Sequence, residues 1–428
     1  MKSLEPLGNK LRRFRDHTVG RFSCVRSVSI LVAVLLVQGG GLSPYAEAFE
    51  IPGEVSVRLR PLKGLISVSG RDLALHSTGL KALLLKTEGF QQWQLRFETL
   101  GGEPAWTVVE RDSGKSLARI QGRFAELRGE DVRVDLRPSP SHLRLVAAKQ
   151  GARFDLQLVG LLALDDYVHG VVSAEVPKNW PLEALKAQAV AARSFALAKL
   201  RERARSGRDW MLEATIMDQV FDHARKHDLA ETAVLATRGE VLMGPHGVAT
   251  AHYHADCGGH TDEPRDVWGG GEAMGTATDR CAKRASSQWR MVASLSELTK
   301  KLNGQGKLQF ASSIAGLTVV QRTDGGRARG IRLTSARGDV ARLTGEDLRA
   351  ALGYMNLRST KFEVKTFGDR AEFSGRGFGH GTGLCQWGAR GLAADGADYR
   401  AILAHYYPKL ELRSLTKSPS DLLAALSP

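Results

Sequence analysis

The pattern of apolar and polar residues divides the chain into a strand-rich first part and a mixed second part. Between residues 50 and 160, short segments such as 55–59 and 143–146 alternate or cluster apolar residues between Gly, Pro and Asp. Segments of this kind are typical of strands. Further strands are predicted at residues 234–254, 317–320 and 331–333.

Helical spacing of apolar residues is clearest after Pro181. Proline suits the first turn of a helix, and Glu183 follows where an acid complements the helix dipole. Apolar residues and alanines then recur at helical spacing as far as Leu200, which predicts a buried central helix. Ser294 and Glu297 have the spacing of a capping box. Two shorter helices are predicted at residues 294–302 and 399–406.

These patterns predict an α+β fold, with a β-rich N-terminal part and a mixed α/β core built around one Ala-rich helix. About 380 residues follow the N-terminal leader, more than one hydrophobic core usually organises. The predicted organisation is a signal peptide at 1–48, a β-rich part at 49–140, a core at 141–412 and a weakly ordered tail at 413–428.

The N-terminus has the pattern of an export signal. Several Lys and Arg residues precede a short apolar run, Val28 to Val37, and small residues follow at Ala46 and Ala48. This order is typical of a cleavable signal peptide. An uncleaved anchor is the alternative, but a run of this length falls short of the ~20 residues that span hydrocarbon. We therefore expect export, with cleavage after Ala48, to the periplasm or the cell wall.

The charge of the chain favours an anionic polymer as a partner. The net charge is +14, and residues 1–48 hold seven Lys/Arg and three acids, which leaves +10 on the remainder. The basic residues are scattered, so an unpatterned solvated surface is the competing interpretation. The export signal and the absence of a binding motif argue against nucleic acid.

Glu175 is the first candidate for chemistry. It lies in the segment Tyr167–Pro177, between an apolar stretch and a loop containing proline, with Arg193 on the helix behind it. Poor solvation would raise the pKa of this carboxyl, and a carboxyl protonated near neutral pH can donate a proton to a leaving glycosidic oxygen. The competing interpretations are a Glu that caps the following helix or one that pairs with Arg193.

A His and Cys cluster is the second candidate. The ligand types suit zinc, but their spacing matches no standard finger. The candidate donors are His252, His254, Cys257, His260 and Cys281. A disulfide between Cys257 and Cys281 is the alternative, because an oxidising compartment favours it.

A third candidate is the glycine-rich segment 375–389. It lacks the Gly-Lys-Ser/Thr end of a phosphate loop and the third Gly of a dinucleotide fingerprint. Alternating glycines permit close approach to a ligand, and His380 and Gln386 offer hydrogen bonds of the kind that sugars use. A tight turn with a purely structural role is the alternative.

Together these segments resemble the family of stage II sporulation protein D and the amidase modifier LytB. The resemblance covers roughly residues 55–412, in the family's order. The segments that carry it are Tyr167–Pro177, 180–193, Cys257–Thr261, 375–389 and Tyr406–Pro408.

The resemblance implies a lytic transglycosylase that acts on peptidoglycan strands stripped of peptides by an amidase, with Glu175 as the catalytic residue. Arg193, His380 and Gln386 are expected to bind the sugar or steady Glu175. No cofactor is required, although some relatives hold zinc near the Cys-Gly-Gly element. The alternatives are a wall-binding protein that enhances an N-acetylmuramoyl-L-alanine amidase without catalysis, and a zinc-dependent hydrolase. The predicted leader leaves both sporulation and general wall turnover open.

Overall fold

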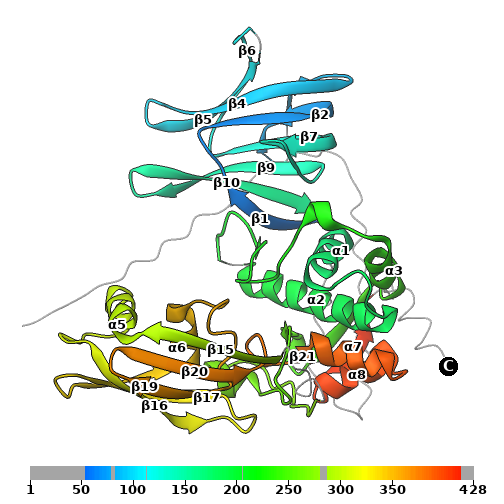
Figure 1. Cartoon of the computed structure of the whole chain (residues 1–428). Coiled ribbons are helices and arrows are strands. Elements are labelled where there is room, and N and C mark those ends of the chain that lie inside the picture. Colours follow the sequence, from blue (N-terminus) through cyan, green and yellow to red (C-terminus); the bar gives the residue numbers. More distant parts are fainter. Residues whose placement is uncertain (1–53, 79–81, 112, 205, 280–286, 416–428) are drawn as a thin grey trace, which may run out of the picture. The chain divides into compact units, whose positions relative to one another are not determined.

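The computed structural model describes residues 54–78, 82–111, 113–204, 206–279 and 287–415. The predicted signal peptide, Cys281 and residues 416–428 of the predicted tail lie outside this part of the chain. Within it, strands and helices form the α+β fold that the sequence predicts (Figure 1). None of its helices combines the length and apolar character that a membrane span requires.

The N-terminal part forms an eleven-stranded sheet in the order β11-β1-β10-β9-β7-β2-β4-β5-β6, with β3 on β2 and β8 on β7. Its strands are β1 Val55–Pro61, β2 Leu65–His76, β3 Leu83–Lys86, β4 Phe90–Leu100, β5 Glu103–Glu110, β6 Ser116–Gln121, β7 Phe124–Val134, β8 Arg137–Pro138, β9 His142–Gln150, β10 Arg153–Leu162 and β11 Leu212–Glu213.

Alternation of apolar and polar residues explains the buried side of this sheet. In β4, Trp93 and Leu95 are buried while Gln92 and Arg96 are exposed, as the two-residue period of a strand requires. The sheet continues past residue 140 through β9 and β10. The boundary predicted between 140 and 141 stays a prediction.

Helix α2 (Leu182–Arg203) is the centre of the next layer and confirms the predicted Ala-rich helix. Pro181 is its N-cap, and its alanines are buried, which allows neighbouring elements to approach closely. Figure 1 shows α7 and α8, from near the C-terminus, beside α2. The other elements here are α1 Leu164–Glu175, α3 Asp228–Ala236, α7 Gln386–Ala394, α8 Tyr399–Tyr406, β12 Glu240–Gly244, β13 Gly247–Val248 and β22 Glu411–Ser414.

Two three-stranded sheets and two helices enclose a separate hydrophobic cluster. The predicted cap is confirmed, since Ser294 Oγ accepts the Glu297 N–H at 3.1 Å. The elements are β15 Gln288–Ser294, β20 Arg370–Arg376 and β19 Phe362–Phe367 in one sheet, β16 Ile314–Arg322, β17 Ala328–Ser335 and β18 Val340–Thr344 in the other, with α5 Leu295–Gly304 and α6 Gly345–Leu352.

Short elements connect these layers and carry much of the candidate chemistry. β14 (Tyr253–His254) pairs in parallel with β21 (Leu384–Cys385), and α4 spans Pro264–Trp268. A 3-10 turn covers His223–Arg225. The strand prediction from Val234 is wrong at its start, because residues 234–236 end α3; the strands β12, β13 and β14 follow.

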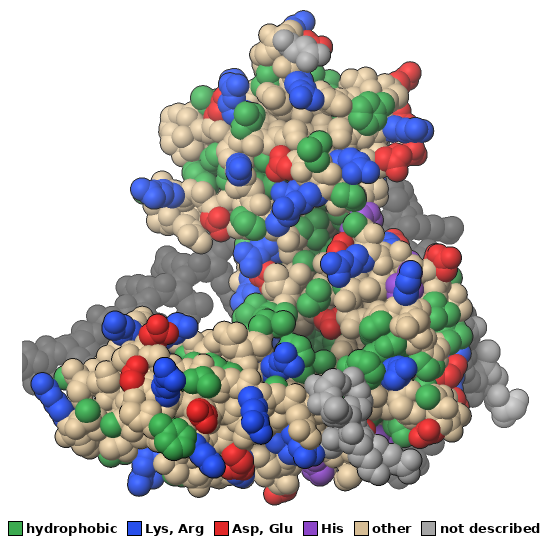
Figure 2. All heavy atoms as spheres, in the orientation of Figure 1, with side chains coloured by type: hydrophobic (Ala, Val, Ile, Leu, Met, Phe, Trp, Pro, Cys, Tyr) green, Lys and Arg blue, Asp and Glu red, His purple; other side chains and the backbone are tan. Residues whose placement is uncertain are grey.

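The surface shows no single basic patch on the face drawn in Figure 2, where Lys and Arg side chains lie dispersed among Asp and Glu. On this face the observation agrees with an unpatterned solvated surface. On this face, attraction of an anionic polymer would depend on local sites.

Ser194 holds α2 against strand β12, and its substitution tests the strength of this contact. Its buried hydroxyl donates to the Val190 carbonyl at 2.7 Å and accepts the Leu242 N–H at 2.8 Å. We expect Ser194→Ala to lower the free energy of unfolding by ~1–3 kcal/mol, because the Leu242 N–H is left buried without an acceptor. Urea denaturation measures the change. Ser206→Ala, at an exposed position, is the control and should leave the midpoint unchanged.

Candidate functional site

A cavity of about 420 Å³ lies where the ends of several elements meet. Its volume is within the range of small-molecule sites. The wall includes four sequence-predicted residues, Glu175, His252, His254 and His380, together with rings and acids that the sequence did not single out. These additional residues include Tyr253, Trp268, Asp218 and Glu346.

Glu175 ends α1 and is half-buried in the cavity wall. Its Oε1 accepts the Val220 N–H at 3.0 Å, and its Oε2 accepts a hydrogen bond from the Gln386 amide at 3.4 Å. Burial raises the pKa of the carboxyl, and these two hydrogen bonds oppose the shift only in part. The group therefore retains a proton at higher pH than an exposed glutamate does.

Glu175 neither caps the helix that follows it nor pairs with Arg193, the two alternatives that the sequence left open. The N-cap of α2 is Pro181, with no side-chain hydrogen bond to the helix end. Among the described residues no Lys, Arg or His forms an ion pair with Glu175, and Arg193 pairs with Asp165 instead. The carboxyl thus meets only neutral donors, an arrangement that suits proton exchange better than a permanent charge.

Gln386 lies behind Glu175 and does not line the cavity. It is the first residue of α7, and its amide also donates to Gln188 Oε1 on α2 at 3.4 Å. Its expected sugar contact is therefore replaced by a positioning contact with Glu175. The sequence could not predict the contacts of Gln188 and the Val220 amide, because neither residue is close to Glu175 along the chain.

His380 lines the cavity, but both of its ring nitrogens are occupied. Nε2 lies 2.9 Å from the Tyr253 carbonyl, and Nδ1 accepts the Thr382 N–H at 3.1 Å. Burial first, then His254 and His252, holds the pKa of His380 well below its usual value. The neutral imidazole therefore offers the cavity its flat ring, not the hydrogen bonds to sugar that were expected.

Three imidazoles and one indole form a ring group at the cavity wall. The ring centroids of His252 and Trp268 are 4.7 Å apart, those of Trp268 and His380 5.0 Å, and those of His254 and His380 5.3 Å. Burial also lowers the pKa of His252, to about 3. His252 and His380 therefore contribute uncharged rings to this aromatic surface.

Arg193 was expected at the substrate, and the structure places it elsewhere. Its guanidinium is 1% exposed and is absent from the cavity wall. It donates to the carbonyls of Thr237 at 2.9 Å and Val234 at 3.2 Å and pairs with Asp165 at 3.3 Å. Because these contacts join α1, α2 and the end of α3, Arg193 is a structural residue.

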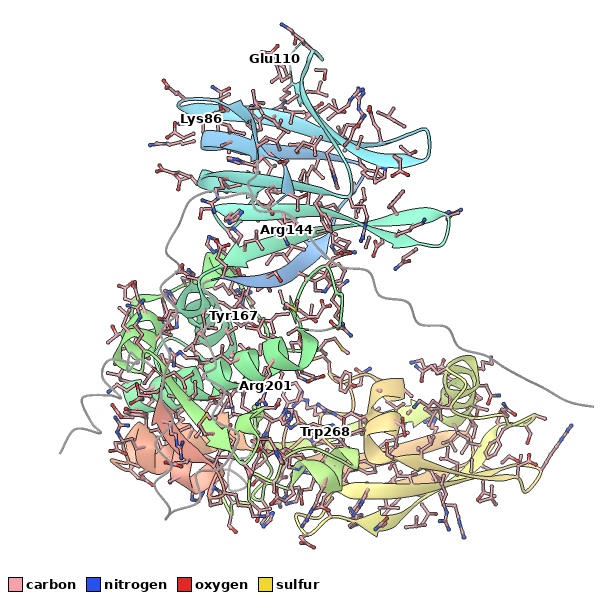
Figure 3. All side chains as sticks on the ribbon, turned by 180° about the vertical axis from the view of Figure 1, so that it is seen from behind. Lys86, Glu110, Arg144, Tyr167, Arg201 and Trp268 are labelled. Atoms are coloured by element: carbon pink, nitrogen blue, oxygen red, sulfur yellow. The ribbon has the colours of Figure 1, made fainter. Side chains whose placement is uncertain are left out.

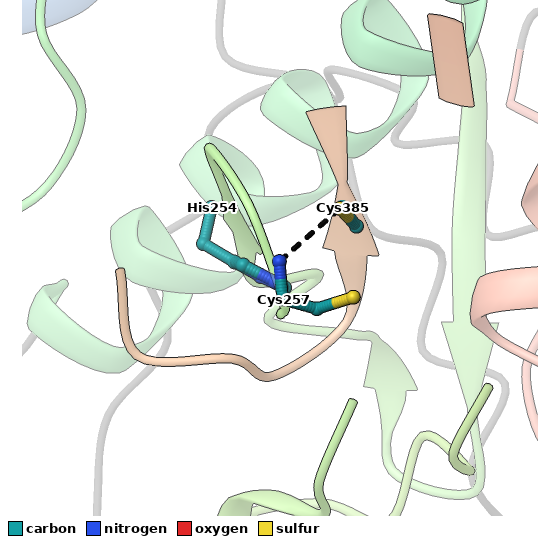
Figure 4. A group of neighbouring side chains, drawn as sticks. All are labelled: His254, Cys257 and Cys385. Atoms are coloured by element: carbon teal, nitrogen blue, oxygen red, sulfur yellow. Dashed lines mark hydrogen bonds between the residues drawn. The ribbon is translucent and has the colours of Figure 1, made fainter. Parts of the chain in front are cut away.

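A possible metal group lies close to the cavity, as Figure 4 shows. The donor atoms of His254, Cys257 and Cys385 all lie within 4.8 Å of one another. His254 and Cys385 are register partners in the β14–β21 pair, and Cys385 Sγ accepts N–H groups of Cys257 at 3.3 Å and Gly388 at 3.4 Å. One imidazole and two sulfurs with N–H donors fit three of the four ligands of a structural zinc site.

This group differs from the expected ligand set. Cys385 takes part, although it is 128 residues from Cys257 in the sequence. His260 is outside the group that the described residues form, and the Cys281 ligand and the Cys257–Cys281 disulfide fall outside the described part. His254 and Cys257 are brought together as expected.

Comparisons with known proteins show what this chain is similar to. Residues 153–243 match the family described as Stage II sporulation protein, and residues 278–383 match a domain of unknown function. An uncharacterised protein of Brachyspira hyodysenteriae is 32% identical over 60% of this chain and 68% of its own length.

Two named relatives are more distant. Stage II sporulation protein D of Bacillus subtilis is 28% identical over 59% of this chain and 74% of its own length. The amidase enhancer of the same species is 27% identical over 57% of this chain and 40% of its own length.

The pKa of Glu175 predicts a pH-dependent difference in stability. A raised folded pKa means that this carboxyl's contribution to stability is complete below the ordinary pKa of glutamate, about 4.3, and is lost as the pH rises through the folded value. Glu175→Gln cannot ionise, so we expect its Tm relative to wild type to increase from acid to neutral pH. A difference that is constant with pH would contradict this. Glu231→Gln, at an exposed position, controls for loss of a carboxylate.

The metal group predicts which substitutions release zinc. We expect the purified protein to bind one zinc per chain, and Cys385→Ser and His254→Ala to reduce this amount strongly, because each removes one ligand. His260→Ala is the matched comparison and should keep the metal. Elemental analysis of proteins purified without chelator measures the ratio. Zinc loss in His260→Ala but not in Cys385→Ser would contradict the assignment.

Proposed function

Because the chain belongs to the family of stage II sporulation protein D and the amidase enhancer LytB, we propose that it is a cell-wall enzyme, a peptidoglycan lytic transglycosylase. It cleaves the linkage between MurNAc and GlcNAc in glycan strands stripped of peptides and leaves an anhydro-MurNAc end. The observation that carries the proposal is a carboxyl, Glu175, that lines a cavity, has a raised pKa and has no cationic partner among the described residues.

In the proposed reaction Glu175 acts first as an acid and then as a base. Its proton passes to the glycosidic oxygen as the bond from that oxygen to C1 of MurNAc breaks. The C6 hydroxyl of the same sugar bonds to C1, and its proton returns to Glu175. No water is consumed, and the attack gains the proximity of an intramolecular reaction. The Val220 amide and Gln386 hold the carboxyl in place through both steps.

The other acids of the cavity wall support a scheme with one carboxyl. Asp218 is bound by both terminal nitrogens of Arg203, at 2.6 and 2.8 Å, and Glu346 lies 3.7 Å from Arg349. Hydrolytic glycosidases generally need a second carboxylate as nucleophile or base. Burial raises the pKa of Glu346 as well, although Arg349 opposes that shift. Glu175 differs in that it faces no guanidinium among the described residues, so it is the better proton carrier, and an internal hydroxyl removes the need for a second carboxylate.

The zinc site has a structural role in this proposal. His254 lines the cavity, but the sulfurs of Cys257 and Cys385 are buried and do not, whereas a catalytic zinc needs a position open to substrate. This argues against the zinc-dependent hydrolase. When bound, zinc would stabilise the β14–β21 pair through His254, Cys257 and Cys385.

A second candidate function is supported by the relative named amidase enhancer. On that proposal the protein binds wall material and stimulates an amidase without cutting glycan. In either case, the predicted signal peptide leads to export, to the periplasm or wall, where peptidoglycan is the partner. The two proposals differ in whether Glu175 is needed.

Glu175→Gln tests the proposed reaction. We expect the variant to lose at least about a hundredfold in the rate of anhydro-MurNAc release from peptide-free glycan, because proton transfer contributes this much or more. Mass spectrometry of the products distinguishes anhydro ends from hydrolysed ends. Glu231→Gln is the control and should retain full activity.

Gln386→Ala tests whether Gln386 positions the carboxyl of Glu175. It should lower kcat more than it raises KM, because Gln386 touches Glu175 and not the cavity. Normal anhydro product from Glu175→Gln would overturn the catalytic proposal. Absence of any cleavage by wild type, with amidase stimulation intact in Glu175→Gln, would establish the enhancer instead.

A further inference from the structure

A second hollow adjoins the Glu175 cavity. Its volume is about 670 Å³, and it shares two wall residues, Trp268 and Glu346, with that cavity. The rest of its wall comes from α4 and Gly269, and from residues of β16, β17, β18 and α6. These strands and α6 lie within the segment that matches a domain of unknown function. We refer to it as the Arg342 hollow, after an arginine in its wall. A polymer bound across Glu175 can therefore continue into it.

Gly330 of β17 forms part of the wall of this hollow. Gly330 of β17 is paired with Gln321 of β16 on one side and Thr344 of β18 on the other. A Cβ at Gly330 would lie 3.2 Å from Gln321 Cβ, so the absence of a side chain leaves backbone as part of the wall.

Trp268 forms the boundary between the two spaces and is labelled in Figure 3. It is 42% exposed, an unusual exposure for so large an apolar side chain. His252 and His380 lie against its ring at 4.7 and 5.0 Å between centroids, and Gly269 follows without a side chain. Supported by these imidazoles, the indole presents a fixed apolar surface of the kind that binds a sugar ring.

The charges of the Arg342 hollow leave one cation uncommitted. Each of its carboxylates already faces a cation. These pairs are Asp266 with Arg329 at 3.4 Å, Glu346 with Arg349 at 3.7 Å and Asp347 with Lys307 at 2.8 Å. No carboxylate of the described residues forms an ion pair with Arg342, which is exposed on β18. Its guanidinium is therefore available to a carboxylate of a ligand.

We propose that the Arg342 hollow is a glycan subsite in which Arg342 binds the lactyl carboxylate of a MurNAc residue and Trp268 stacks on a neighbouring sugar. This inference rests on the proposed function, because it assumes that the Glu175 cavity takes peptidoglycan. A MurNAc residue exposes this carboxylate only when no peptide is attached to it. Arg342 would thus select peptide-free strands, and the segment around it would be a specificity element.

Binding to an inactive protein tests the subsite separately from catalysis. Full-length protein with Glu175→Gln is titrated calorimetrically with peptide-free GlcNAc–MurNAc oligosaccharides and with chito-oligosaccharides of equal length, which lack the carboxylate. Adding Arg342→Gln should weaken binding of the MurNAc ligand about tenfold, the loss expected for one charge-assisted contact, and leave chito-oligosaccharide binding unchanged. Adding Trp268→Ala should weaken both ligands.

The control is Arg337→Gln, which removes the same charge at the exposed turn between β17 and β18, away from the hollow. It should change neither affinity. Equal effects of Arg342→Gln on both ligands, or an unchanged affinity for the MurNAc ligand, would overturn the subsite. Selective MurNAc binding by a protein whose wild type never cleaves glycan would support the subsite while overturning the transglycosylase.

Discussion

The carboxyl of Glu175 is held between a backbone N–H and a neutral side-chain amide. The chemistry proposed for the cavity depends on these two hydrogen bonds. A guanidinium in place of Gln386 would lower the pKa of the carboxyl and fix its charge. An apolar residue in place of Gln386 would leave Oε2 without a donor once the carboxyl lost its proton. Two neutral donors allow both protonation states at one position, which a group that first gives and then takes a proton requires.

Those donors reach Glu175 because distant segments pack against α2. Gln386 lies 211 residues from Glu175, and Val220 lies 45 residues from it. Arg193 and Ser194 on α2 hold α1, α3 and β12 by buried hydrogen bonds. Substitution of Arg193 or Ser194 should therefore lower the stability of the fold, although neither residue touches the cavity.

Sequence reasoning predicted the features that depend on local pattern. The Ala-rich helix after Pro181, the cap at Ser294 and the strands of the N-terminal sheet follow from spacing that a single segment displays. Helix α3 was missed because it is short, and its last residues, from Val234, are as compatible with a strand. Helix α7 was missed because Gly388 and Gly391 weaken its helical propensity, and packing on α2 compensates.

The site was predictable only in part for the same reason. Glu175, His254 and Cys257 were identified within their own motifs, whereas Cys385 joins His254 and Cys257 only through the pairing of β14 with β21. Arg193 was misplaced because a charged residue on a helix gives no sign of which face is buried when alanines surround it. Burial of that guanidinium required carbonyl partners, and these lie more than 40 residues away.

The strand pair β14–β21 connects the two chemical features of the site. His254 and Cys385 face each other in its register, and Gln386, which holds Glu175, is the next residue of the chain. Tyr253 precedes His254, and its carbonyl accepts the hydrogen bond that orients His380. A metal bound by His254, Cys257 and Cys385 would therefore fix both the amide that positions the acid and the imidazole that lines the cavity. Its contribution to catalysis would be mechanical, through a rigid pair of strands, without any contact to the sugar.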